Sequence, residues 1–168
     1  MTGRAVGDRP VHSLLVKVIH WGFVLLYAYA IYKGLESVDQ LADRELLNFE
    51  FVFATVFLAV TAARFFLMRR YFTSALANDT PKVIKWAALY GHYAIYAAVS
   101  LIAISGIMVG LLYRFGVEAG LIMEATIALH EIAVTGSYVI IGGHVAAALM
   151  HRVLGDGVWG AMVPLWRG

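Results

Sequence analysis

Four blocks of apolar residues, each near the length needed to cross a lipid bilayer, dominate this chain of 168 residues. The blocks lie at about 14–32, 46–68, 90–113 and 125–150, and a spanning helix needs about 20 such residues. Only 14% of the residues are charged, whereas a soluble domain of average composition has about a quarter. Because the connections are short, neighbouring helices should be antiparallel. The sequence predicts an all-α integral membrane protein, with residues 1–168 forming a single antiparallel bundle of four transmembrane helices.

The basic residues are distributed unequally between the two ends of this bundle. Most lie at the end that carries both termini and the connection between the second and third helices. By the positive-inside rule, both termini and that connection are expected in the cytoplasm. The net charge of +2 is therefore a signal of orientation and indicates no nucleic-acid partner. The residues that carry the signal are Arg4, Arg9, Lys17, Arg64, Arg69, Arg70, Lys82, Lys85, Arg152 and Arg167.

The chain contains no cysteine. Disulfides, thiolate metal sites, iron–sulfur clusters and covalently attached c-type haem are therefore excluded. A metal or cofactor would have to be held by other side chains, and histidine is the strongest candidate.

Two histidines lie at matching depth inside the predicted bundle. His20 lies about two turns inside the cytoplasmic end of the first helix, and His144 lies about two turns from the same face on the fourth. Two neutral imidazoles on opposite sides of a porphyrin are what a b-type haem requires. Packing histidines are the alternative, but an ionisable side chain within a membrane is a functional hypothesis by default. Gly22, Gly142 and Gly143 nearby indicate either close helix packing or room for a flat macrocycle.

Further polar side chains gather near the cytoplasmic face. A single haem takes two histidine ligands, so His92 and His151 would not be needed for it. Together with Lys17 they are candidates for a quinone site. Hydrogen bonds to lipid headgroups are the alternative role for the histidines. Arg64 within the second helix is a candidate partner for a haem propionate, whereas snorkelling to lipid phosphate is the commoner role of such cations.

His130 stands alone near the outer end of the fourth helix. The second helix at that depth reads Asn48-Phe49-Glu50-Phe51-Val52 and offers no imidazole. Glu50 or Met123 could complete a metal site, or Glu50 could simply accept a hydrogen bond from His130. The pattern leaves these alternatives open.

Three segments resemble the bacterial cytochrome b561 family, within the larger group of di-haem b-type cytochromes that serve hydrogenases and formate dehydrogenases. The segments are IHWGFVLLYAYA, GHYAIYAAVSLIAISGIMVG and LHEIAVTGSYVIIGGHVAAALMHRVLGDGVWGAMVP. The resemblance implies that His20 and His144 bind a haem b on the cytoplasmic side and that His130 is one ligand of an outer haem. His92 and His151 match histidines that the family retains.

The chain departs from the family in the segment RELLNFEFVFATVFLAVTAARFF. The family places the second ligand of the outer haem there, whereas this chain has Glu50 or Phe51. One haem is therefore expected, and the outer one is absent, singly ligated or held by an unusual partner.

The resemblance implies a multi-pass protein of the bacterial inner membrane that carries electrons. Two family roles apply: oxidation of superoxide with electrons passing to ubiquinone, or a link between a redox partner protein and the quinone pool. The alternative is a haem-depleted accessory or structural subunit of a larger membrane complex. Whether the chain is itself an oxidoreductase stays open at this point.

Overall fold

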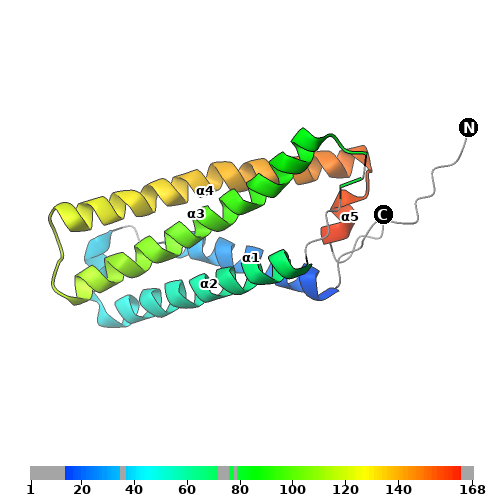
Figure 1. Cartoon of the computed structure of the whole chain (residues 1–168). Helices are drawn as coiled ribbons and strands as arrows, with labels where there is room; N and C mark the ends of the chain where they lie inside the picture. Colours follow the sequence, from blue (N-terminus) through cyan, green and yellow to red (C-terminus); the bar gives the residue numbers. More distant parts are fainter. Residues whose placement is uncertain (1–13, 35–36, 72–75, 78, 164–168) are drawn as a thin grey trace, which may run out of the picture.

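The computed structural model describes residues 14–34, 37–71, 76–77 and 79–163. In this part of the chain all regular structure is helical, and four helices are long and apolar enough to cross a membrane. The fold class predicted from the sequence, a four-helix membrane bundle, is confirmed (Figure 1). Arg4, Arg9 and Arg167, which contribute to the predicted orientation, lie outside the described residues.

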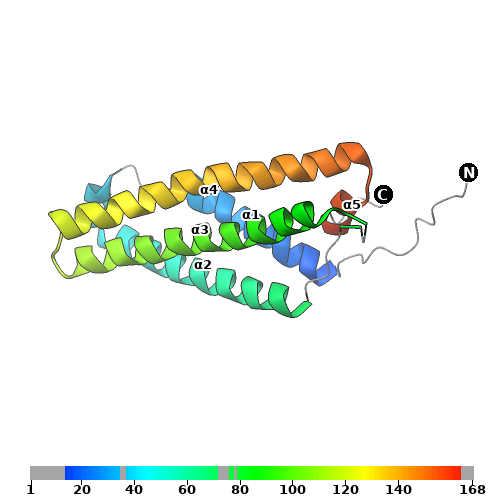
Figure 2. The same cartoon turned by 45° about the horizontal axis from the view of Figure 1, so that its top comes forward.

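The elements follow one another as α1, η1, α2, α3, α4 and α5. The long helices are α1 (Leu14–Tyr32), α2 (Arg44–Tyr71), α3 (Lys82–Arg114) and α4 (Leu121–Leu154). A 3₁₀ helix, η1 (Val38–Ala42), joins α1 to α2, and a short helix, α5 (Val158–Met162), follows α4. We call the end of the bundle where α1 begins and α5 lies the terminal end, and the other the far end (Figures 1 and 2).

The first helix has the bounds expected from the sequence, whereas the other three are longer. Hydropathy detects only the apolar part of a helix, while backbone hydrogen bonding continues through polar residues at both ends. α2 begins early because the Asp43 carboxylate accepts hydrogen bonds from the backbone of Glu45 and Leu46, at 2.8 and 3.3 Å. α4 ends at Leu154, and the next residue, Gly155, forms a left-handed cap with a φ of 62°.

The helices are not packed equally tightly. α3 packs along both α2 and α4, whereas α1 approaches α2 closely over only a short stretch. The Tyr27 hydroxyl on α1 reaches across to Ser137 on α4, at 2.7 Å between the oxygens. A small core of Phe23, Phe57, Val99 and Ala103 joins α1, α2 and α3 near mid-bundle. The loosely packed sides of α1 are therefore where a ligand between helices could be held.

Candidate haem-binding site

His20 on α1 is in contact with a cation from the neighbouring helix. The Arg64 Nη2 atom on α2 lies 2.6 Å from His20 Nδ1. Its guanidinium carbon also lies 4.9 Å from the centroid of the Phe23 ring and 5.9 Å from that of Tyr96. Arg64 is thus held among aromatic rings inside the bundle rather than extended towards a headgroup.

Arg64 has no acidic partner in the part of the chain that the structure describes: no carboxylate there lies within ion-pair distance of it. A charge inside a membrane-spanning segment is costly and is normally paired. The imidazole of His20 supplies one acceptor but no negative charge. The surroundings of Arg64 therefore suit an anionic group.

Two further histidines, one on α3 and one on α4, lie against each other. The His92 ring on α3 and the His144 ring on α4 meet edge to face, with centroids 5.1 Å apart and planes at 77°. His92 Nδ1 donates to the carbonyl oxygen of Ala88 at 2.6 Å, which places its proton on that nitrogen. We call His20, Arg64, His92 and His144 the histidine layer, because together they draw on all four long helices.

The glycines beside this layer are not sites of close helix packing. A Cβ atom built on Gly22, Gly142 or Gly143 would meet no atom within 4 Å. Gly91, next to His92, is equally open. Gly22, Gly142 and Gly143 are exposed, so close helix packing, one of the two interpretations left open by the sequence, does not apply to them.

The terminal end of α1 is tied to α5. Lys17 is 7% exposed, and its ammonium donates to the carbonyl oxygens of Gly160 and Val163 at 2.9 and 3.4 Å. The Trp21 indole nitrogen donates to the carbonyl of Met162 at 3.1 Å. These bonds satisfy carbonyls at the end of a short helix, where no intrahelical donors remain.

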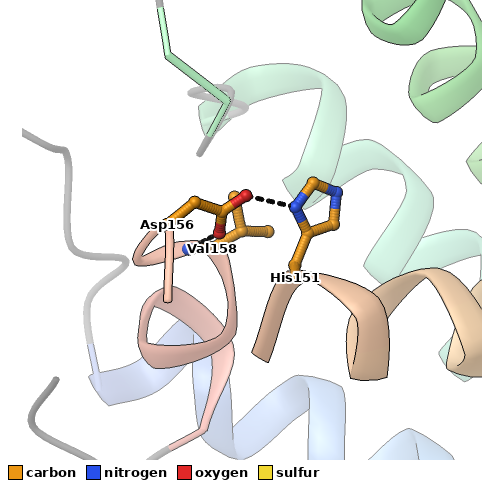
Figure 3. A network of polar contacts seen from close by, with 3 residues as sticks. All are labelled: His151, Asp156 and Val158. Carbon is orange, nitrogen blue, oxygen red and sulfur yellow. Dashed lines mark hydrogen bonds and ion pairs between the residues drawn. The ribbon is translucent and has the colours of Figure 1, made fainter. Parts of the chain in front are cut away.

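His151 is paired with an acid that follows it closely in the chain. Its Nδ1 lies 2.5 Å from Asp156 Oδ2, while Asp156 Oδ1 accepts from the Val158 backbone at 3.1 Å (Figure 3). Asp156 therefore holds His151 with one oxygen and the start of α5 with the other. Asp156 was not singled out from the sequence, although its place five residues after His151 was a usable signal.

Trp159 on α5 is a second residue that the sequence analysis missed. Its indole Nε1 is buried without a hydrogen-bond partner among the described residues. The Arg152 guanidinium carbon lies 5.2 Å from the centroid of its ring. A buried N–H without an acceptor costs free energy, so this atom is suited to donate to a bound molecule.

His130 lies away from the histidine layer, towards the far end. Its Nδ1 is 3.0 Å from the Oγ of Ser105 on α3. Ser105 was not singled out from the sequence, yet it stands nine residues from the far end of its helix, as His130 does. Depth matching of polar residues on adjacent spans would have found this pair.

The family model of prokaryotic cytochrome b561 matches residues 11–165, which is nearly the whole chain. The chain belongs to this family. It is thus a multi-pass bacterial membrane protein and a b-type cytochrome of electron transfer, and membership implies that it binds haem b. Neither the curated proteins nor the solved structures gave a match to this cytochrome.

Proposed function

We propose that this cytochrome binds one haem b in the histidine layer, with His20 and His144 as axial ligands. The observation that carries the proposal is the contact of His20 with Arg64, a cation without a carboxylate partner in the described residues. Imidazoles on α1 and α4, open space at the adjacent glycines and a cation for a propionate are the features that a bis-imidazole haem needs. The residues present therefore fit the group.

Binding requires a rearrangement at His20. Arginine has only donors, so His20 Nδ1 accepts from Arg64 and the proton of the neutral ring is on Nε2. A histidine that ligates iron through Nε2 must carry its proton on Nδ1 instead. We therefore expect Arg64 to leave Nδ1 and to pair with a propionate when His20 becomes a ligand.

The bound haem would supply a one-electron carrier, and the chain would set its environment. His20 and His144 would act as axial ligands in a site of low polarity, and Arg64 would add positive charge nearby. In this proposal electrons pass between the quinone pool and either a redox partner protein or superoxide. The protein lies in the bacterial inner membrane with both termini in the cytoplasm.

Quinone exchange is proposed at the terminal end, near Lys17, His92 and His151. Lys17 would act there by holding α5 in place, because its ammonium is engaged by backbone carbonyls. His151, paired with Asp156, would pass protons. Trp159 Nε1 is a buried donor without an acceptor among the described residues, and a quinone carbonyl would provide one.

Substitution of the ligands tests the haem assignment. His144→Ala should abolish the low-spin absorption spectrum of the haem in the histidine layer, because one axial imidazole is lost. His130→Ala should leave that same spectrum largely intact. An unchanged spectrum in His144→Ala, or loss of the whole signal in His130→Ala, would contradict the proposal.

A second candidate function is that of an accessory subunit without turnover of its own. The observation that favours it is α2, Arg44–Tyr71, which contains no histidine and so cannot complete a second bis-imidazole site. A pyridine haemochrome assay with independent protein quantification, combined with reduction by quinol, separates the two. Haem that quinol reduces supports the electron-transfer role, whereas one inert haem or none supports the accessory role.

A further inference from the structure

A ligand-sized cavity lies in the far half of the bundle. Its volume is about 640 Å³, and residues of η1 and of all four long helices line it. Sites for small molecules in proteins commonly measure about 300–1,000 Å³ and have mainly apolar walls with a few polar groups. The four residues of the histidine layer are not among those that line this cavity, so the two sites are separate.

The charged side chains of the far cavity are both acidic. Glu50 of α2 and Glu131 of α4 line it, whereas no lysine or arginine is among its described lining residues. In the described part of the far end the basic residues are exposed and lie outside the lining; they are Lys33, Arg44 and Arg114. The cavity therefore carries acidic charge alone.

Neither acid is paired with a cation. Among the described residues, no lysine or arginine nitrogen lies within ion-pair distance of Glu50 or Glu131. Glu131 stands ten residues into α4, roughly 15 Å along the helix axis. A charge within a membrane-spanning segment is costly and is normally paired. The far cavity is thus the converse of the surroundings of Arg64, and it suits a positively charged group.

The walls of the cavity are rich in aromatic rings. They include Tyr27, Phe51, Phe53, Phe57 and Tyr138. The face of an aromatic ring attracts cations because of its quadrupole. One wall ring already shows this preference, since the Arg114 guanidinium carbon lies 4.9 Å from the centroid of Phe51. The walls therefore offer an apolar surface that also stabilises positive charge.

His130 adds an acceptor to the same cavity. The Ser105 hydroxyl donates to the backbone carbonyl of Leu101 at 2.6 Å, so its oxygen accepts from His130 Nδ1–H at 3.0 Å. With its proton on Nδ1, the neutral ring has a lone pair on Nε2 and brings no positive charge of its own. His130 therefore does not neutralise the two acids.

We propose that the far cavity binds an amphipathic organic cation, of the quaternary ammonium or phosphonium class. The acids of the walls hold its charge, and the aromatic rings hold its apolar groups. This inference does not depend on a haem in the histidine layer. Loss of the low-spin spectrum in His144→Ala tests that haem, whereas cation binding tests the far cavity.

Tetraphenylphosphonium is the probe, because its charge is permanent and its phenyl groups are apolar. Binding of the radiolabelled cation to the purified full chain is measured by equilibrium dialysis in detergent, with protein-free micelles as the blank. We expect saturable binding, with one cation per chain at saturation. Absence of saturable binding above the blank would overturn the inference.

Substitution of the acids tests the charge. Glu50→Gln and Glu131→Gln should each weaken binding roughly tenfold or more, as when one partner of a desolvated charge pair is lost. Glu50→Asp keeps the charge and should stay within a few-fold of the original affinity, which separates loss of charge from misfolding. Glu124→Gln is the matched control, because Glu124 is an exposed acid in the first turn of α4 and does not line the cavity. Unchanged affinity in both Glu50→Gln and Glu131→Gln would contradict the proposal.

Substitution of a wall ring tests the aromatic contribution. Phe53→Leu should weaken binding roughly two- to tenfold, because it keeps an apolar side chain but removes the ring. Phe49→Leu is its control: Phe49 stacks on Phe53 with centroids 6.0 Å apart, yet it does not line the cavity. Equal affinities of these two variants would show that the cation is not held against this wall.

A neutral competitor separates charge recognition from apolar partition. Triphenylphosphine oxide carries three phenyl groups and no net charge. It should not displace tetraphenylphosphonium at comparable concentrations. Displacement at the affinity of the cation would mean that the cavity selects shape alone, and the inference would fail.

Discussion

At the scale of single residues, Arg64 has an unusual environment for a charged side chain within a spanning helix. It lies within a spanning helix, contacts His20 and two aromatic rings, and has no carboxylate within ion-pair distance among the described residues. The commoner role of such a side chain is to extend towards the headgroups. The Arg64 guanidinium instead lies over aromatic rings of α1 and α3. A fixed positive charge at this level favours a bound anion and disfavours further positive charge.

Arg64→Gln should therefore lower the midpoint potential of the haem in the histidine layer. Oxidation adds a positive charge to the haem, and loss of a neighbouring cation makes that oxidised form less costly. We expect a shift on the order of tens of millivolts, since about 1.4 kcal/mol corresponds to 59 mV for one electron. A redox titration followed in the visible spectrum measures it.

Arg64→Lys is the control for this prediction, because it keeps the charge while changing the geometry of the donors. Its potential should stay closer to that of the unchanged protein. Equal shifts in the two variants, or none in either, would show that the charge of Arg64 does not act on the haem.

At the scale of elements, α5 is the segment whose position depends most on side chains from elsewhere. It has five residues, too few for a stable isolated helix. Lys17 and Trp21 of α1 donate to its last carbonyls, and Asp156 accepts from its first turn. α5 therefore depends on α1, although more than 100 residues separate them in the chain.

Lys17→Met should release α5 while keeping the length and much of the apolar stem of the side chain. The Gly160 and Val163 carbonyls would lose their donor, and residues 155–163 should become more sensitive to limited proteolysis in detergent. The expected increase in cleavage rate is about 10- to 100-fold, in line with about 1.5–3 kcal/mol for a lost hydrogen bond to a charged group.

Lys33→Met is the matched control for this experiment, because Lys33 is an exposed lysine that directly follows the far end of α1. It should leave cleavage at 155–163 unchanged. If both variants are cut at the rate of the original protein, the contacts from Lys17 do not hold α5 in place.

At the scale of the whole molecule, the four long helices form a bundle with two unlike ends. The terminal end carries α5 and the connection from α2 to α3, while the far end carries η1 and the turn between α3 and α4 (Figure 1). The basic residues predict that the terminal end faces the cytoplasm. Because the chain has no cysteine, single introduced thiols report orientation without interference.

Asp79→Cys and Glu118→Cys place one thiol at the terminal end and one at the far end, both at exposed positions. In intact spheroplasts, a membrane-impermeant maleimide should label Glu118→Cys and should reach Asp79→Cys only after the membrane is permeabilised. The reverse pattern of labelling would contradict the predicted orientation.

Much of this architecture was predictable, because a bilayer imposes its thickness directly on the sequence. The four apolar blocks located the four long helices, and α1 was placed with its observed bounds. The ends of α2, α3 and α4 were predicted short, since capping and interfacial turns involve polar residues that hydropathy does not detect. The family was also identifiable from the spacing of histidines and small residues in the fourth helix.

The sequence by itself determined the number of spans, the family and the set of intramembrane histidines, because each depends on residue type and spacing along one helix. Only the tertiary structure decided which side chains meet: Arg64 with His20, His92 with His144, Ser105 with His130, and Lys17 with α5. Such pairs depend on the rotation of each helix about its axis and on its offset along the bundle. Those quantities are set by packing between helices, which no single helix encodes.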